Sequence, residues 1–222
     1  MEKKTVAFYT LGCKVNQYET NAMTQQFIQA GYEVVDFINN ADVYIINTCT
    51  VTNMSDRKSR QMIRRVKEKN PKAIVVACGC YAQVGKEELE KIEEIDLILG
   101  INEKNKIVEL VEKFDKNREK EQVVSDVMQQ KQFMDFGSIT YTERNRAVIK
   151  VQDGCDNFCS YCIIPYARGR IRSRQIESVV EEVTKIAQKG IKEVVLTGIH
   201  LASYGKDLKR IHWLNRFTKR AK

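Results

Sequence analysis

Three cysteines in the stretch CDNFCSYC have the spacing of ligands for a metal centre. Cys155, Cys159 and Cys162 follow the pattern C-x₃-C-x₂-C, and no fourth cysteine or histidine lies near them in the sequence. We expect the chain in the reducing cytosol, where disulfides are rare, so a disulfide between these cysteines is not expected. Structural zinc takes four protein ligands, and only three are present here. Three thiolates suit a four-iron cluster that keeps one iron open for chemistry. A zinc site that recruits His200 or His212 is the alternative.

Three further cysteines each follow a predicted buried strand. Cys13, Cys49 and Cys80 end the segments TVAFYTLGC, DVYIINTC and AIVVACGC. The carboxyl ends of parallel strands line the crevice where such sheets bind ligands. Each thiol could simply be a small buried side chain, but three at strand ends favour a second open iron–sulfur cluster. Cys78 lies one residue inside its strand and is predicted to point to the opposite side, either as a packing residue or as a neighbour that supports the ligands.

Cys13, Cys49 and Cys80, the first triplet along the chain, must be positioned by the elements of residues 1–115. Cys155, Cys159 and Cys162 form the second triplet. Short apolar runs rich in β-branched residues alternate with amphipathic helices, which is typical of a parallel α/β sheet. Strands are predicted over 5–10, 42–47, 73–77 and 96–99, with a weaker one over 32–37. Helices are predicted over 17–30, 53–69, 83–93 and 103–115.

A polar stretch without periodicity follows and is predicted to connect two domains. It covers residues 116–145, with a short strand around 123–127. The next domain is predicted to begin with a strand over 147–152, directly before CDNFCSYC. A helix over 175–189 and a strand over 192–198 follow, so this domain starts strand, loop, helix, strand.

The cysteine loop, with Tyr161 before its third cysteine, resembles the cluster loop of radical S-adenosylmethionine (SAM) enzymes. The resemblance implies that this loop follows the first strand of a β/α barrel. It also implies that the open iron binds SAM, which is cleaved to a 5′-deoxyadenosyl radical. Tyr161, together with Thr197 and Gly198 at the end of a later strand, is expected to contact this cofactor.

Motifs along the whole chain resemble those of the methylthiotransferase family. They are TLGCKVNQYET, NTCTVT and GCYAQ in the first part, then GRIRSR and TGIHLASYG after the cysteine loop. The resemblance implies two [4Fe-4S] clusters, an auxiliary one on Cys13, Cys49 and Cys80 and the radical SAM one on Cys155, Cys159 and Cys162. The implied fold is α/β: a flavodoxin-like parallel sheet domain (1–115), a linker (116–145) and the first units of an incomplete radical SAM β/α barrel (146–205).

The motifs GCKVNQYET and GIHLASYG resemble the branch of this family that modifies tRNA at N6-threonylcarbamoyladenosine 37. This implies methylthiolation of C2 of that base, with the tRNA anticodon stem-loop as partner and flavodoxin or ferredoxin as electron donor. The branches acting on isopentenyladenosine 37 or on a ribosomal protein aspartate are the alternatives. Asn16 and Gln17 could hydrogen-bond the cluster or cofactor, or could serve the start of a helix.

The net charge of +8 is concentrated in a few segments. Arg168, Arg170, Arg172 and Arg174 alternate after the cysteine loop and are predicted to contact RNA phosphates, although one or two could hold the cofactor carboxylate. The predicted helix 53–69 would extend this surface. Its cations are Arg57, Lys58, Arg60, Arg64 and Arg65. A simply solvated face is the competing interpretation.

Length sets a limit on these expectations, since the family runs to about twice this size. The basic tail 206–222 departs from the family pattern, and two barrel strands with one helix would leave an unpaired sheet edge. We therefore expect 147–222 to pack poorly alone, and catalysis by this chain is not expected. A non-catalytic metal scaffold and an RNA-binding fragment are the alternative functions. No apolar run reaches membrane-spanning length, which predicts a cytoplasmic protein without a membrane partner.

Overall fold

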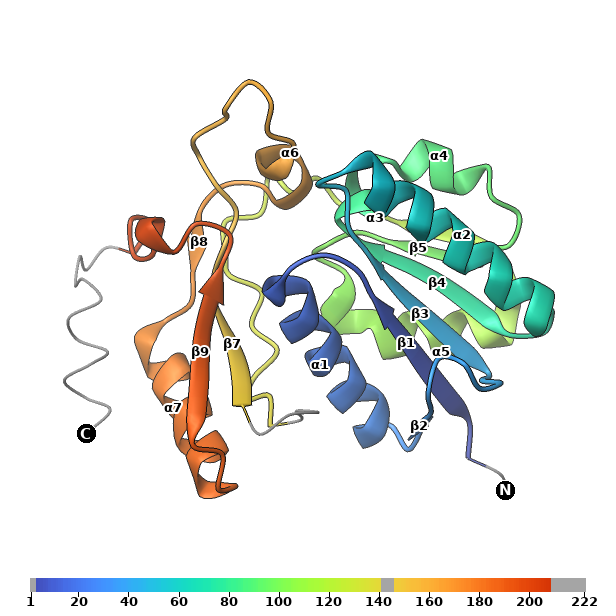
Figure 1. The fold of residues 1–222 in the computed structure, drawn as a ribbon, viewed down its shortest axis with the longest axis horizontal. Helices are drawn as coiled ribbons and strands as arrows, with labels where there is room; N and C mark the ends of the chain where they lie inside the picture. The colour runs from blue at the N-terminus through green and yellow to red at the C-terminus, as the bar shows by residue number, and fades with distance from the viewer. Residues whose placement is uncertain (1–2, 141–145, 209–222) are drawn as a thin grey trace. The chain divides into compact units, whose positions relative to one another are not determined.

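The structure is a computed structural model that describes residues 3–140 and 146–208 (Figure 1). The chain forms two compact units, one ending at Asp126 and the other beginning at Val127. In the described part of the chain, no helix combines the length and the apolar character needed to cross a membrane. Most of the predicted basic tail, residues 209–222, lies outside the described residues.

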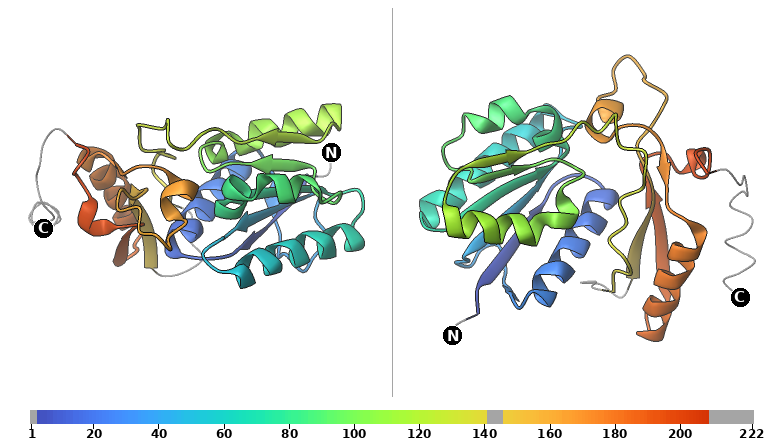
Figure 2. Two further views of the ribbon diagram at one scale, coloured as in Figure 1. Left: turned by 90° about the horizontal axis from the view of Figure 1, so that it is seen from above. Right: turned by 180° about the vertical axis from the view of Figure 1, so that it is seen from behind.

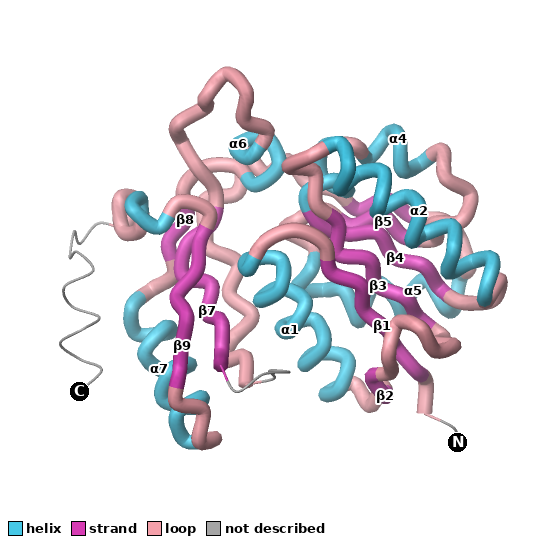
Figure 3. The backbone as a smooth tube through the Cα atoms, in the orientation of Figure 1, coloured by secondary structure: helices cyan, strands magenta, loops and turns pink. Residues whose placement is uncertain are grey.

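The first unit is built on a six-stranded parallel sheet (Figure 3). Its strands are β1 (Thr5–Thr10), β2 (Glu33–Val34), β3 (Val43–Thr48), β4 (Ile74–Gly79), β5 (Leu97–Leu99) and β6 (Glu121–Val123). The spatial order β2-β1-β3-β4-β5-β6 contains the flavodoxin order, with the chain reversing its direction of travel across the sheet between β1 and β3. The predicted flavodoxin-like domain is therefore confirmed.

Helices cover both faces of this sheet, as Figure 2 shows. They are α1 (Lys14–Gln29), α2 (Asn53–Lys69), α3 (Cys80–Val84), α4 (Lys86–Glu90), the 3₁₀ helix η1 (Lys104–Lys106) and α5 (Ile107–Asn117). Met23 and Phe27 of α1 pack with α5 against one face of the sheet, whereas Ile63 and Val66 of α2 pack with α3 and α4 against the other. Both faces are apolar because both are covered, which explains the continuous hydrophobic strands in the sequence.

Three elements differ from the sequence prediction. The helix predicted over 83–93 is two short helices that meet at Gly85, whose amide donates to the carbonyl of Tyr81 and closes α3. The strand predicted over 32–37 is only β2. Strand β6 pairs with β5 inside the stretch predicted as a linker, so the first part of that stretch belongs to the sheet.

The second unit holds a three-stranded sheet in the order β8-β7-β9. Its elements are β7 (Arg146–Asp153), α6 (Ile164–Arg168), β8 (Arg172–Ser173), α7 (Ile176–Gln188), β9 (Glu193–Gly198) and the 3₁₀ helix η2 (Leu201–Ser203). Strands β7 and β9 are parallel and joined through α7, as expected for the first unit of a β/α barrel. Val179 and Ile186 of α7 pack against Ile149 and Val151 in a small core. The antiparallel β8 and the short α6 were not predicted.

Candidate metal centres

The sheet brings three of the predicted ligands to its carboxyl edge. Cys13 is the N-cap of α1 after β1, Cys49 directly follows β3, and Cys80 is the first residue of α3 after β4. Thr10 pairs in register with Asn47, and Thr48 with Gly79, so the three strands end side by side. This edge includes the point between β1 and β3 where such sheets bind ligands.

Two glycines allow close packing at this edge of the sheet. Gly12 has φ +100°, and a Cβ added there would lie 2.7 Å from the sulfur of Cys49. Gly79 has φ +102°, and its Cβ would collide with the carbonyl oxygen of Thr48. Both positions therefore require glycine, on steric and conformational grounds. The space next to the Cys49 sulfur is kept by the absence of a side chain.

Buried amides fix the loops that carry Cys13 and Cys49. The Asn16 side chain donates to the carbonyls of Leu11 (2.7 Å) and Thr48 (3.0 Å). The Asn47 side chain donates to the carbonyl of Asn16 and to the hydroxyl of Thr20, both at 3.0 Å. Of the two roles considered for Asn16, the structure shows the local one: its amide holds the start of α1 against the ends of β1 and β3.

A buried ion pair completes this network, and sequence reasoning missed it. The Lys104 ammonium lies 2.6 Å from a Glu19 carboxylate oxygen, and both side chains are fully buried. Lys104 also donates to the side-chain oxygen of Asn47 at 2.9 Å. No sequence pattern marks the pair, because its members are 85 residues apart. Lys104 therefore supports, through Asn47, the strand end that precedes Cys49.

Cys78 is set apart from the other thiols of this unit. It is fully buried in the hydrophobic cluster on the α1 and α5 face of the sheet, as strand alternation predicted. Burial raises the pKa of its thiol to about 11. Cys78 therefore packs in the apolar face of the sheet, where its thiol lies 3.9 Å from the side-chain oxygen of Asn47.

This contrast predicts the alkylation pattern of the metal-free protein. With iodoacetamide near pH 8, the exposed Cys13 and Cys159 are expected to react first. Cys78 is expected to stay unmodified until the protein is unfolded, because its thiol is both buried and protonated. Peptide mass spectrometry over time measures this, with the urea-unfolded chain as the control. Equal rates for Cys78 and Cys13 in the folded chain would contradict the assignment.

In the second unit, the three other predicted ligands lie on the loop after β7. Gly154 has φ +69°, and a Cβ there would collide with the carbonyl of Arg170, so only glycine fits. The Cys155 amide donates to the carbonyl of Gly169 at 3.0 Å, and that of Cys162 to the carbonyl of Cys159 at 2.9 Å. Cys159 is exposed, and the other two cysteines are half-buried.

Aromatic contacts shape the outer part of this loop. Phe158 meets Tyr166 edge to face at 5.7 Å, and the Arg170 guanidinium lies over the Phe158 ring at 4.8 Å. Asp156 accepts a hydrogen bond from the Ile171 amide. Tyr161, a predicted cofactor contact, keeps 90% of its surface exposed. It is therefore accessible to a ligand.

Gln152 links the cysteine loop to the other predicted cofactor contacts. Its amide nitrogen donates to the carbonyls of Asp153 and Gly154, and its oxygen accepts from the His200 amide, each at 2.7 Å. Gln152 pairs in register with Gly198, where a Cβ would lie 2.9 Å from its side chain. Thr197 and Gly198 thus lie beside the carboxyl end of β7, where the cysteine loop begins.

The arginine prediction needs correction. Arg168 and Arg172 are buried and pair with Asp153 at 3.1 Å and 3.6 Å, and Asp153 also pairs with Lys150 at 2.6 Å. Buried side chains held by a carboxylate are not available to RNA phosphates. The alternating sequence pattern could not show this, because the carboxylate lies on another strand.

Arg174 needs the same correction. Its guanidinium is buried and pairs with Asp135 at 2.9 Å and with Glu182. Burial raises the pKa of the Glu182 carboxyl, although Arg174 acts in the opposite direction. Of the four arginines predicted to contact RNA, Arg170 alone is exposed, and it lies 3.8 Å from Asp156 of the cysteine loop.

The donor chemistry of both triplets fits an iron–sulfur cluster. Each offers three thiols just after the carboxyl ends of parallel strands, and glycines allow close packing there, Gly12 against the Cys49 sulfur and Gly154 against the Arg170 carbonyl. Within the residues that the structure describes, no three histidine, cysteine or acidic side chains are grouped as around a single metal ion. The six cysteines therefore stay predicted ligands.

Comparisons with known proteins match both units. Residues 5–100 match the model of the "Uncharacterized protein family UPF0004", and residues 149–214 match that of the "Radical SAM superfamily". The protein "Threonylcarbamoyladenosine tRNA methylthiotransferase MtaB" of Aquifex aeolicus (strain VF5) is 52% identical over 202 residues, covering 91% of this chain and 49% of the relative. The protein of the same name from Bacillus subtilis (strain 168) is 46% identical over 205 residues, covering 92% and 46%. The chain spans about half the length of these curated relatives.

A solved structure shares the fold. The radical S-adenosylmethionine methyltransferase TsrM from Kitasatospora setae, solved with cobalamin and a [4Fe-4S] cluster bound, matches with a TM-score of 0.56. The match covers 90% of this chain and 49% of that chain at 18% identity. At this identity the likeness concerns the fold alone.

Proposed function

Because the chain belongs to the methylthiotransferase family of radical SAM proteins, we propose that it serves methylthiolation of tRNA at C2 of N6-threonylcarbamoyladenosine 37. The observation that carries the proposal is the placement of two cysteine triplets. One lies where β1, β3 and β4 end, and the other lies on the loop after β7. The relatives named for this reaction are about twice as long. The proposal therefore concerns the reaction of a longer protein, for which this chain supplies the two cysteine triplets.

In this proposal each triplet holds one [4Fe-4S] cluster. Cys155, Cys159 and Cys162 hold the cluster that keeps an iron open for SAM, and the triplet of the first unit holds the auxiliary cluster. When bound, the two clusters and SAM would supply the one-electron chemistry that breaks an unactivated C–H bond, and also the sulfur and the methyl group to be transferred.

The chain's own residues position and admit these groups. Gly12 and Gly154 leave room next to the ligand loops, and Gln152 fixes the start of the second loop against β9. The exposed Tyr161 is proposed to contact SAM, as are Thr197 and Gly198 at the end of β9. An electron donor such as flavodoxin or ferredoxin is the proposed reductant, and the cytoplasm is the proposed compartment.

Metal content tests the ligand assignment. The chain, purified without oxygen and reconstituted with iron and sulfide, is expected to hold about eight irons, four for each of two clusters. Replacing Cys13 or Cys159 by Ser is expected to leave about four. Cys78→Ala is the matched control, since that thiol packs in the hydrophobic cluster on the α1 and α5 face of the sheet, and it should retain the full content. A single zinc per chain would contradict the proposal in favour of a metal scaffold.

Product analysis tests the reaction itself. The reconstituted chain is mixed with SAM, a reductant and an anticodon stem-loop that carries N6-threonylcarbamoyladenosine. Nucleoside mass spectrometry then tests for the 2-methylthio product, which Cys13→Ser should not form. A product on isopentenyladenosine RNA instead would move the chain to another branch. No product from the fully loaded chain would mean that this chain alone does not perform the reaction.

A further inference from the structure

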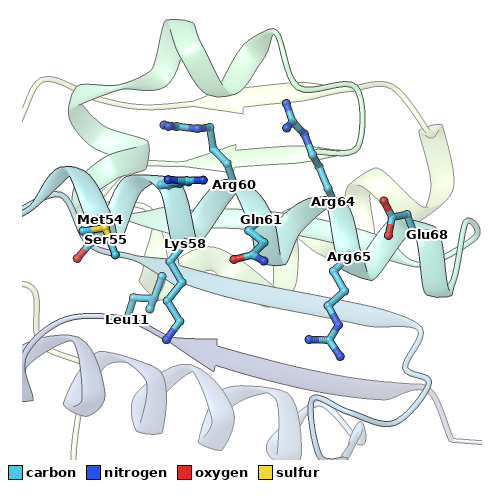
Figure 4. Close-up of a pocket in the computed structure, with 10 residues that line it drawn as sticks. Leu11, Met54, Ser55, Lys58, Arg60, Gln61, Arg64, Arg65 and Glu68 are labelled. Atoms are coloured by element: carbon cyan, nitrogen blue, oxygen red, sulfur yellow. The ribbon is translucent and has the colours of Figure 1, made fainter.

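Helix α2 borders a groove whose walls are strongly basic. The groove has a volume of about 1240 Å³ and belongs to the first unit alone. Figure 4 shows Lys58, Gln61 and Arg65 extending from one side of α2, and Arg60 and Arg64 from the other. The spacing of three and four residues places these side chains in rows along the helix. The lining is completed by Leu11, Met54, Ser55, Arg57 and Glu68.

The cations of this groove differ in whether the protein already uses them. Arg60 donates to the Tyr81 hydroxyl at 2.6 Å and lies 3.7 Å from Glu88, and Arg64 lies 4.0 Å from Glu94. In the part of the chain that the structure describes, no carboxylate forms an ion pair with Arg57, Lys58 or Arg65, and all three are exposed. These three cations are therefore available to an external anion. We refer to Arg57, Lys58 and Arg65 as the open cations of the groove.

One end of the groove is apolar and lies near the first triplet. Leu11 immediately precedes Gly12 and Cys13, and its amide is bound to the carbonyl of Asn47 at the end of β3. Met54 stands in the first turn of α2 with 73% of its surface exposed. The chain reaches α2 only a few residues after Cys49. The groove thus runs from the half-buried Leu11 and the exposed Met54, near two predicted cluster ligands, to cations further along α2.

We propose that this groove binds single-stranded RNA, with the open cations on consecutive phosphates and an unstacked base against Leu11 and Met54. Arg57 and Arg65 are separated by about 12 Å along the helix, which is a row of sites rather than a pocket for one small anion. A cationic row tracks a phosphate backbone, while apolar surface receives splayed bases. The inference rests on the proposed function and adds where the first unit holds the RNA.

A charge-matched pair of variants tests this surface in the full chain. One carries Arg57→Gln, Lys58→Gln and Arg65→Gln. The other carries Lys91→Gln, Lys106→Gln and Lys116→Gln, which removes the same charge from exposed positions outside the groove. Binding of a fluorescent anticodon stem-loop is measured by anisotropy between low and physiological salt. The groove variant is expected to bind the RNA at least about 10-fold more weakly. The plot of log K against log salt concentration should also become less steep by about 2 for this variant, whereas the control variant keeps the steepness of the unsubstituted chain.

Several results would overturn the inference. They are no RNA binding by the unsubstituted chain, equal weakening in both variants, or equal affinity for a fully paired duplex. Effective competition by poly-glutamate would assign the groove to polyanions in general. Groove-dependent binding by a chain that takes up a single zinc in place of iron would count against the proposed function and leave this inference standing. Undiminished product formation by the groove variant at limiting RNA would overturn this inference and leave the proposed function standing.

Discussion

Replacing Lys104 by Met is expected to lower the free energy of unfolding of the first unit by about 3–5 kcal/mol. The substitution leaves the Glu19 carboxylate fully buried without the ammonium that lies 2.6 Å from it. It also removes a donor from the Asn47 side-chain oxygen. Since whole domains are stable by about 5–15 kcal/mol, one side chain would carry a large share of the total. Urea unfolding followed by circular dichroism measures the change.

Two variants separate the ion pair from a general effect of substitution. Lys106→Met changes an exposed lysine of the same 3₁₀ helix and should cost little. Glu19→Gln combined with Lys104→Met removes the buried uncompensated charge and should recover part of the loss. If the double variant is as unstable as Lys104→Met, the pair is not the cause. In the reconstituted protein, Lys104→Met should also hold less iron, because Asn47 fixes the loops that carry two predicted ligands.

Much of the fold could be predicted because its signals are local. The hydrophobic run TVAFYT is β1 to the residue, and α2 begins and ends where its pattern predicts, with Thr52 as its cap. Elements held by tertiary contacts were predicted less well: the short strand expected around 123–127 lies at β6, Glu121–Val123, and β8 was not predicted. Strand β6 exists because β5 offers an edge, and β8 because β7 does. Neither has a periodicity of its own, since each is only two or three residues long.

The candidate site was likewise predictable only where the signal is local in the sequence. The cysteines could be proposed as ligands because residue type and spacing are visible in the sequence, and strand alternation correctly placed Cys78 on the other face from its neighbours. The roles of the charged residues could not be found. Whether Arg168 meets RNA or a buried carboxylate depends on which strand lies beside it. Exposed Arg170 and buried Arg172 look alike in the motif GRIRSR.

Asp153→Asn is expected to have the largest effect in the second unit, again about 3–5 kcal/mol. Lys150, Arg168 and Arg172 all pair with this carboxylate, and the four side chains are at most 3% exposed. An amide keeps the shape and can still accept from the Gly154 amide, as the carboxylate does at 2.9 Å. The substitution therefore removes the charge alone. Hydrogen exchange of peptides from β7 and α7 measures the loss of protection in this unit.

Asp156→Asn is the matched control, because it removes a carboxylate from the same loop at an exposed position. Its nearest cation is Arg170 at 3.8 Å, and such surface pairs contribute about 0–1 kcal/mol. Equal exchange in the two variants would show that the charge of Asp153 does not hold the unit together. If the charge of Asp153 does hold the unit together, its removal must also disturb the position of Cys155, because only Gly154 separates the two residues. Asp153→Asn should then retain only about four irons, those of the first unit, while Asp156→Asn retains both clusters.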